Sequence, residues 1–363
     1  MMKTLLRAMI TSAMVSYAGL AAASVDLKSD HPDVYYVKQG DTLWDISSTF
    51  LDSPWQWPEL WHVNQEIDNP HLIYPGDVIH LVYVDGQPRL QLERKGSEDT
   101  GASAKMMSDG SIVKLKPEIR VSSLDSAIPA IPLDSVQTFL KDALVLTPEE
   151  IKSAPYIVGG EDGRVVYGKN DRVYVRDPYT EWASLSQNYG FHRVGEKYVD
   201  PETQEILGYE ALQVGLGRVT NQQKDIATMR ILKSTEELKP EDRAFTTPER
   251  AVQSVFYPSA PTTEIDARVI HFFGRLSGVA RNDVVVINKG TREGLVDGNV
   301  LEVRQAGEKV KDRISGQLIT LPSETIGTLV IFRTYEKVSY ALVVRSTAPI
   351  SKNDIVTNPV GSL

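Results

Sequence analysis

The chain has 363 residues and lacks cysteine altogether. Disulfide bridges and thiolate metal sites are therefore excluded, and stability must come from hydrophobic cores. An excess of positive charge is also missing, because 48 acidic residues outnumber 39 lysines and arginines, for a net charge of −9. This balance argues against a nucleic-acid binder, which needs the opposite sign, and against electrostatic capture by anionic lipid.

Catalytic and metal-binding patterns are scarce as well. The six histidines fall into no zinc-binding spacing such as His-Glu-x-x-His. Ser111-Ile112-Val113-Lys114 matches Ser-x-x-Lys, but the other signatures of penicillin-binding enzymes are missing. Gly215-Leu216-Gly217 begins a dinucleotide-binding pattern, yet Thr220 stands where the third glycine belongs. The sequence predicts no catalytic residue, no metal ion and no cofactor.

The first residues have the pattern of a secretory signal peptide. Lys3 and Arg7 precede an apolar run from Ala8 to Leu20, and three alanines end it at Ala23. Polar residues interrupt this run, which argues against a membrane anchor, and no later stretch is apolar for eighteen residues. We expect cleavage after Ala23, export, and no membrane insertion of the remaining chain.

The strongest local pattern runs from Val34 to Val84. The expected elements, in order, are a strand over Val34–Lys38, a helix after Thr42, a short helix carrying Trp57, Leu60, Trp61 and Asn64, and a strand over Val78–Val82. Asp45 stands three residues after Thr42, which is the spacing of a capping box. Pro75-Gly76 is a turn signal before the last strand.

This order of elements and these motifs resemble the LysM module, a small glycan binder of cell-wall proteins. The resemblance implies a small α+β fold with βααβ order for residues 34–84. It also implies a shallow groove between two loops that holds chains containing N-acetylglucosamine. The matching loop positions here are Gly40, Asp41, Thr42 and Leu43 in the first loop, and Asn69, Pro70, His71, Leu72 and Ile73 in the second.

Small turn residues in such loops let backbone amides approach the acetamido groups of the glycan, and apolar side chains cover sugar faces. Each neutral hydrogen bond contributes roughly 0.5–1.5 kcal/mol, so a few of them predict an affinity nearer micromolar than nanomolar. We expect Trp44, Leu60 and Trp61 in the core instead, because so short a module without disulfides needs every large apolar side chain.

The rest of the chain divides by composition. A polar, turn-rich stretch predicts a flexible linker at residues 85–111. Residues 112–153 predict a strand and two helices, one at Ser135–Lys141 and one that begins after a Thr147 cap. The remainder is rich in valine, isoleucine, tyrosine and glycine and predicts short strands.

Those strands fall into two related units. At an offset of 112, Asn170-Asp171 matches Asn282-Asp283, and Asp242 matches Asp354. We therefore predict two barrel-like β units at residues 154–245 and 266–357, joined by a linker at residues 246–265. The fold class is thus multidomain, with the LysM-like module followed by a short helical element and these two units.

The layout resembles the TsaP family, LysM-containing proteins associated with the type IV pilus secretin of Gram-negative bacteria. The resemblance covers Ala127–Leu133, Ala154–Val158 and Asp171–Arg176, and the C-terminal region is similar to part of the flagellar accessory protein FlgT. It implies a non-catalytic periplasmic scaffold that binds peptidoglycan and contacts an outer-membrane secretin. The alternative is a peptidoglycan-remodelling enzyme with an unrecognised catalytic domain, which zymography on purified wall would reveal.

Overall fold

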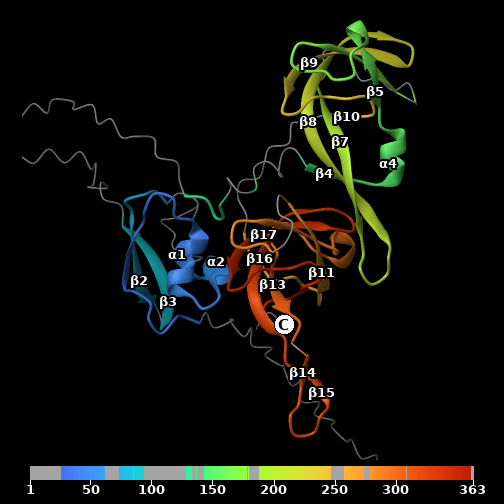
Figure 1. The fold of residues 1–363 in the computed structure, drawn as a ribbon. Coiled ribbons are helices and arrows are strands. Elements are labelled where there is room, and N and C mark those ends of the chain that lie inside the picture. The colour runs from blue at the N-terminus through green and yellow to red at the C-terminus, as the bar shows by residue number, and fades with distance from the viewer. Residues whose placement is uncertain are drawn as a thin grey trace, which may run out of the picture.

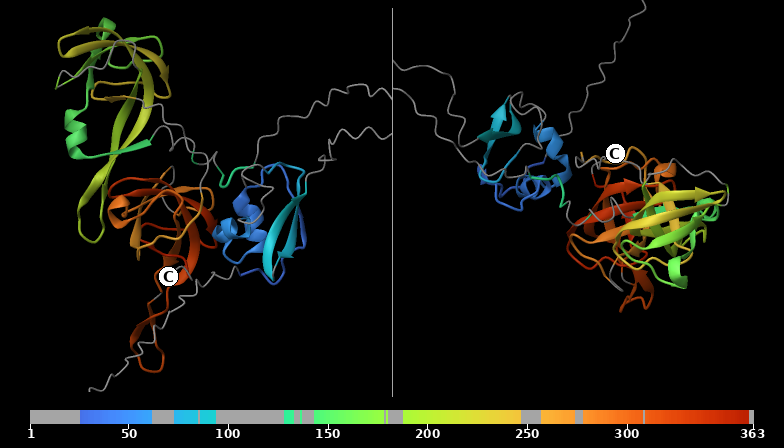
Figure 2. Two further views of the ribbon diagram at one scale, coloured as in Figure 1. Left: turned by 180° about the vertical axis from the view of Figure 1, so that it is seen from behind. Right: turned by 90° about the horizontal axis from the view of Figure 1, so that it is seen from above.

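The computed structural model describes residues 26–61, 73–84, 86–93, 128–132, 136, 143–177, 179, 188–246, 257–273, 278–307 and 309–360. The predicted signal peptide and most of the predicted helix at Ser135–Lys141 lie outside these residues. So do residues 94–111 of the predicted linker and the strand expected after Ser111. Figure 1 shows three bodies: an N-terminal module of residues 26–93, a first β-barrel and a second β-barrel, with the second barrel between the other two (Figures 1 and 2).

The N-terminal module has the predicted βααβ order with one strand more. Its elements are β1 (Val34–Tyr36), α1 (Leu43–Phe50), a 3-10 turn (Pro54–Gln56), α2 (Trp57–Trp61), β2 (Val78–Val84) and β3 (Gln87–Glu93). The three strands form an antiparallel sheet in the order β1-β2-β3. Because β3 pairs with β2 through a two-residue connection, the predicted start of the linker at residue 85 is wrong. The missed signal was Asp85-Gly86, a hairpin dipeptide between two strand-like runs.

The first barrel closes through one long strand. Its strands are β5 (Tyr156–Gly160), β6 (Arg172–Arg176), β7 (Asn188–Val199), β8 (Ile206–Gln223), β9 (Ile226–Ser234) and β10 (Arg243–Thr246). β8 pairs with both β7 and β9, which closes the order β8-β7-β10-β5-β6-β9 into a ring. Before it come β4 (Ala143–Leu146), which pairs with β8, and α4 (Pro148–Ser153). The predicted helix after Thr147 is confirmed, with a complete capping box between Thr147 and Glu150.

The second barrel is closed in the same order. Its strands are β11 (Asp266–Phe272), β12 (Val284–Ile287), β13 (Val300–Gln305), β16 (Glu324–Thr334), β17 (Ser339–Ser346) and β18 (Ile355–Thr357). They form a closed barrel in the order β11-β12-β17-β16-β13-β18. Between β13 and β16 a separate hairpin of β14 (Lys309–Lys311) and β15 (Leu318–Thr320) projects away from the barrel (Figure 1). Short 3-10 turns cover Glu161–Gly163 in the first barrel and Thr291–Glu293 in the second.

Strand pairing in the two barrels shares one register. Adding 112 to each residue number converts the pair Gly215–Ser234 of β8 and β9 into the pair Gly327–Ser346 of β16 and β17. The same offset converts the pair Ile157–Val175 into Val269–Ile287 and keeps the irregularity that follows each. The offset found in the sequence is therefore also the offset of the hydrogen-bonded ladders.

The Asn-Asp match between the two units forms the same turn in each barrel, directly before a strand. Asn170 has φ 75° and Asn282 has φ 71°, the left-handed region that asparagine tolerates better than most residues. The following aspartate closes each turn, because Asp171 accepts the backbone N–H of Gly168 at 2.8 Å and Asp283 accepts that of Ala280 at 2.9 Å. A short side chain that hydrogen-bonds the backbone this way fixes where the next strand begins.

The outer face of the second barrel is as apolar as its interior where β12 and β17 form it. All four residues of β12, Val284–Ile287, are buried, as are the first six of β17. One set of these side chains fills the barrel, and the other joins an outer cluster with side chains from the rest of the chain. The outer cluster includes Trp44 of the N-terminal module, Ile131 and Val136 between the bodies, and Tyr198 and Leu207 of the first barrel.

The hairpin of β7 and β8 extends beyond the first barrel and reaches the second (Figure 1). At its end the Tyr198 and Tyr340 hydroxyl groups lie 3.3 Å apart, and the Asn288 amide donates to Asp200 at 2.8 Å. The Lys337 ammonium lies 2.7 Å from the Glu205 carboxylate. The two barrels are therefore joined by two buried polar contacts and a partly exposed ion pair, beside an apolar cluster.

We expect the first barrel to lose stability as pH falls from about 6.5 to 4. His192 is buried beside Phe245 and its Nδ1–H donates to the Gly190 carbonyl at 3.1 Å. Burial lowers the pKa of His192 from 6.5 to about 4. Because the unfolded chain takes up the proton first, unfolding becomes easier by roughly 3 kcal/mol across this window.

His192→Phe removes the titrating group while keeping a ring of similar size. Chemical denaturation at pH 7 and pH 5 measures the effect, and the difference between the two pH values should shrink in the variant. An unchanged difference would mean that another group controls the acid response.

Candidate glycan-binding groove

The first loop of the N-terminal module is a tight turn between β1 and α1. Gly40 has φ 91°, a conformation that favours glycine. The Asp41 carboxylate accepts the Lys38 backbone N–H at 2.8 Å and the Tyr35 hydroxyl at 3.0 Å. Burial, and then this bond to Asp41, raises the pKa of Tyr35 to about 12. Thr42 ends the turn as the predicted cap of α1, its hydroxyl oxygen accepting an N–H at 3.1 Å.

The second loop ends in a turn of the same kind before β2. Gly76 has φ 96°, and the Asp77 carboxylate accepts the Tyr74 backbone N–H at 3.0 Å. Val37 joins the two loops, because its carbonyl accepts the Gly76 N–H at 2.8 Å and its own N–H donates to the Asp77 carbonyl at 3.0 Å. The two turns are therefore held side by side at one end of the module.

Backbone groups between these turns bind a peptide of the same chain. The N–H groups of Leu43 and Trp44, the first two residues of α1, donate to the carbonyls of Pro129 and Ala130 at 3.0 and 3.2 Å. On the other side, the Ile128 N–H donates to the Ile73 carbonyl at 2.8 Å. The first N–H groups of a helix have no partner within the helix, so they are available to an outside acceptor.

This set of donors and acceptors suits secondary amides. A peptide group and the N-acetyl group of an amino sugar both present one N–H donor and one C=O acceptor. A groove with two N–H groups at a helix start and a carbonyl opposite can therefore hold either kind of chain through neutral hydrogen bonds. Specificity then depends on which side chains and rings the two loops admit.

Comparison with known proteins places the module in a family. Residues 35–81 match the LysM domain family. This stretch is a LysM domain. A protein of Bacillus subtilis (strain 168) named uncharacterized protein YqbP is 35% identical over 60 residues, which is 14% of this chain. The match spans 27% of that relative's length. LysM domains bind peptidoglycan and related carbohydrates, which supports a role in cell-wall binding.

The LysM domain arranges the predicted site residues unequally. Gly40 is exposed and Asp41 is half-buried, whereas Thr42, Leu43 and Ile73 are buried. The side chains of Leu43 and Ile73 belong to the core of the domain, so the prediction that they cover sugar faces is wrong. Both residues still line the groove through their backbone groups. The other four predicted positions, Asn69, Pro70, His71 and Leu72, lie outside the described residues.

Trp44 is buried, but the prediction that it belongs to the core of the LysM domain is wrong. It packs in the outer cluster of the second barrel, and the neighbouring Asp45 forms an ion pair with Arg281 of that barrel. Trp57 and Leu60 do fill the LysM core, with 1% of each exposed. The predicted core position of Trp61 lies outside the described side chains. An amphipathic pattern shows that Trp44 must be covered, but it does not show by what.

Sequence reasoning missed Ile128–Ile131 as a partner of the groove. The repeated Ala-Ile-Pro pattern of Ala127–Pro132 stood out, and its prolines favour extended backbone, which leaves carbonyls free to accept. No local rule connects this segment to a helix start more than eighty residues earlier. Elsewhere in the described part of the chain, no three histidine, aspartate or glutamate side chains gather to hold a metal ion. Nor does any helix there have the length and apolar character to cross a membrane.

We expect Trp44→Ala to detach the LysM domain from the second barrel without unfolding it. The substitution removes the buried tryptophan that the domain contributes to the outer cluster. Limited proteolysis should release the LysM domain faster, as a fragment that itself resists further cleavage. Trp57→Ala is the matched control, because loss of a core tryptophan costs about 3–5 kcal/mol and should unfold the domain. Loss of the resistant fragment in Trp44→Ala would contradict this assignment.

Proposed function

We propose that the protein is a non-catalytic periplasmic scaffold that anchors the outer-membrane secretin of a type IV pilus to peptidoglycan. In this proposal the LysM domain binds the cell wall. The match of residues 35–81 to the LysM family is the observation that carries it. The secretin contact rests on the resemblance of the whole layout to the TsaP family. We assign wall binding to residues 34–84 and partner binding to the two barrels, with export through a signal peptide at residues 1–23.

The groove supports wall binding by its chemistry. Peptidoglycan contains N-acetylated amino sugars at every position, so its acetamido groups offer repeated donors and acceptors to the groups between Leu43 and Ile73. A few neutral hydrogen bonds give a weak site. Several LysM domains held by one ring-shaped partner would gain avidity of roughly 10²–10⁴, since linked weak sites bind together.

The hairpin of β14 and β15 supports a protein partner for the second barrel. Ile314 at its turn is 98% exposed and Leu318 is 75% exposed, on a hairpin that projects away from all three bodies (Figures 1 and 2). Ile319 and Leu321 are exposed beside them. Exposed apolar side chains gathered on a protruding element are typical of an interaction site.

Co-sedimentation with purified peptidoglycan tests both halves of the proposal. The full chain should pellet with the wall, and a detergent-solubilised secretin ring should pellet only when the chain is added. A ring that pellets equally without the chain, or a chain that pellets without carrying the ring, would contradict the anchor. Clearing of the wall in a zymogram would instead favour the remodelling enzyme.

We expect Thr42→Ala to weaken wall binding several-fold. Losing a helix cap costs roughly 0.5–2 kcal/mol, and here it loosens the helix start that presents the Leu43 and Trp44 N–H groups. Thr147→Ala is the matched control, since it removes the equivalent cap from α4 outside the LysM domain. Pelleting at increasing amounts of wall measures both variants. A similar loss in the two variants would mean that general stability, not the groove, sets the binding.

A further inference from the structure

The groove of the LysM domain is already filled by the chain's own Ile128–Ile131. The segment makes three backbone hydrogen bonds there, to Leu43, Trp44 and Ile73. Ile128 is 4% exposed and Ala130 is 1% exposed, and both side chains belong to the LysM core. The LysM domain therefore holds the segment both by its backbone groups and by two buried side chains.

The opposite side of the segment contacts the second barrel. Ile131 belongs to the outer apolar cluster together with Trp44 and Val284. The ion pair between Asp45 and Arg281 lies next to the same helix start. The segment is therefore enclosed between the LysM domain and the barrel, and it cannot leave the groove without breaking contacts with both.

A glycan and this segment need the same groups. The Leu43 and Trp44 N–H groups and the Ile73 carbonyl are each committed to the segment at 2.8–3.2 Å. An acetamido group that used them would have to replace a peptide group of the same hydrogen-bonding character. The two ligands thus exclude each other.

We propose that Ile128–Ile131 is an intramolecular ligand of the LysM groove and that a wall glycan binds only by displacing it. This rests on the proposed function, since it takes the groove as the glycan site. The segment's ligand class is an extended peptide with small and branched apolar side chains. Separation of the LysM domain from the second barrel removes the contacts of Ile131 and so weakens the binding of the segment in the groove. A partner that pulls the two bodies apart therefore also favours wall binding.

The fraction of time that the segment occupies the groove sets how strongly it lowers the affinity for glycan. If the segment fills the groove nine-tenths of the time, the affinity for glycan is reduced roughly tenfold relative to an open groove. Ala130→Glu opens the groove in the full chain, because a charged side chain has no room at a position with 1% exposure. Ser153→Glu is the control, since it adds the same charge at an exposed site of α4.

Titration with a chito-oligosaccharide of N-acetylglucosamine units tests the proposal. Ala130→Glu should bind roughly tenfold more tightly than the wild type and Ser153→Glu, and a synthetic peptide of residues 127–133 should compete in Ala130→Glu. Equal binding by all three proteins would overturn the intramolecular ligand while leaving wall binding intact. If none of the three proteins binds glycan, the proposed function fails, but binding of the synthetic peptide still tests whether the segment occupies the groove. If the peptide binds to Ala130→Glu and not to the other two proteins, this result supports the place of the segment in the groove. If the peptide binds to none of them, the intramolecular ligand is overturned.

Amide hydrogen exchange gives a second readout. The Ile128 N–H should exchange slowly in the free wild-type protein, because it donates to the Ile73 carbonyl, and faster once glycan is bound. Slow exchange of Ile128 in the glycan complex would also overturn the proposal.

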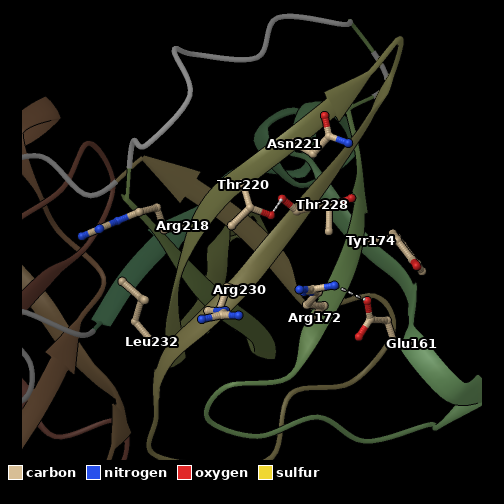
Figure 3. Close-up of a pocket in the computed structure, with 9 residues that line it drawn as sticks. All are labelled: Glu161, Arg172, Tyr174, Arg218, Thr220, Asn221, Thr228, Arg230 and Leu232. Atoms are coloured by element: carbon tan, nitrogen blue, oxygen red, sulfur yellow. Dashed lines mark hydrogen bonds and ion pairs between the residues drawn. The ribbon is translucent and has the colours of Figure 1, made fainter.

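A separate observation concerns the first barrel, where three arginines stand in one row across adjacent strands. Arg172 of β6 is the cross-strand partner of Arg230 of β9, which is the partner of Arg218 of β8. The three line an open hollow of about 570 Å³ together with Tyr174 and Thr228. Figure 3 shows how these side chains lie on the strands. All three arginines are exposed, although the chain as a whole carries a net charge of −9.

The second barrel has valine or leucine at each matching position. Adding 112 converts the row into Val284, Leu342 and Val330, which pair across strands in the same way. These three are buried in the outer cluster under polypeptide from the rest of the chain. One barrel face is therefore covered by polypeptide, and its counterpart on the other barrel is basic and open.

Fold stability does not account for the arginine row. Like charges directly opposite each other on a sheet are destabilising. Glu161 neutralises only one end, at 2.9 Å from Arg172, while Arg218 donates to the neutral Asn188 amide oxygen at 3.0 Å. Within the described part of the chain, Arg230 at the centre has no ion-pair partner. Such a row gains stability when carboxylates from outside accept its fork of N–H donors.

We infer that this row docks an acidic polypeptide segment of a partner protein. The matching face of the second barrel is covered by polypeptide, which favours a peptide occupant. A segment that crosses the strands would place carboxylates about 4.8 Å apart, the spacing between neighbouring strands.

Fluorescence anisotropy with a labelled peptide of eight glutamates tests this docking site in the full chain. Arg218→Gln with Arg230→Gln should lose at least tenfold in affinity. Arg313→Gln with Arg345→Gln is the control, because it makes the same charge change at two exposed positions outside the row, one in the β14–β15 hairpin and one in β17. An equal loss in the control, tighter binding to phosphatidylglycerol vesicles than to the peptide, or no binding by the wild type would each overturn the inference.

Discussion

The outer apolar face of the second barrel holds the molecule together. Val284, Val330 and Leu342 would expose a continuous hydrophobic patch if nothing covered them, and burial of such surface stabilises contacts by about 25 cal/mol per Å². Side chains from every other body cover this face, among them Trp44 of the LysM domain and Tyr198 of the first barrel. The LysM domain and the first barrel both pack on this one face.

The two barrels show how one scaffold can serve two purposes. Strand pairs of the first barrel become pairs of the second when 112 is added to each residue number, so the two backbones share one strand arrangement. They differ in what the shared outer face carries. In β6 buried and exposed residues alternate, as expected for a strand with one face exposed to solvent, whereas in β12 every residue is buried. The duplicated unit therefore keeps its interior and changes its partner through a few outward side chains.

The groove depends on backbone chemistry more than on side chains. Gly40 and Gly76 shape two turns, aspartates close them, and Val37 joins them, which leaves the Leu43 and Trp44 N–H groups and the Ile73 carbonyl aligned between them. Because an amide on a sugar and an amide in a peptide offer the same donor and acceptor, a site of this kind can be occupied by its own chain. Neutral hydrogen bonds of this kind are individually weak, so a few of them make a modest binder.

The sequence by itself determined the local features of this protein. Thr42 and Thr147 cap helices, Asp171 and Asp283 close turns, and the LysM motifs order their strands and helices, because each depends only on residues a few positions away. Only the tertiary structure decided which surface buries Trp44, that Leu43 and Ile73 serve the groove through their backbone, and that Ile128–Ile131 lies within it. An apolar pattern states that a side chain must leave water, whereas the surface that receives it is chosen by the packing of distant segments.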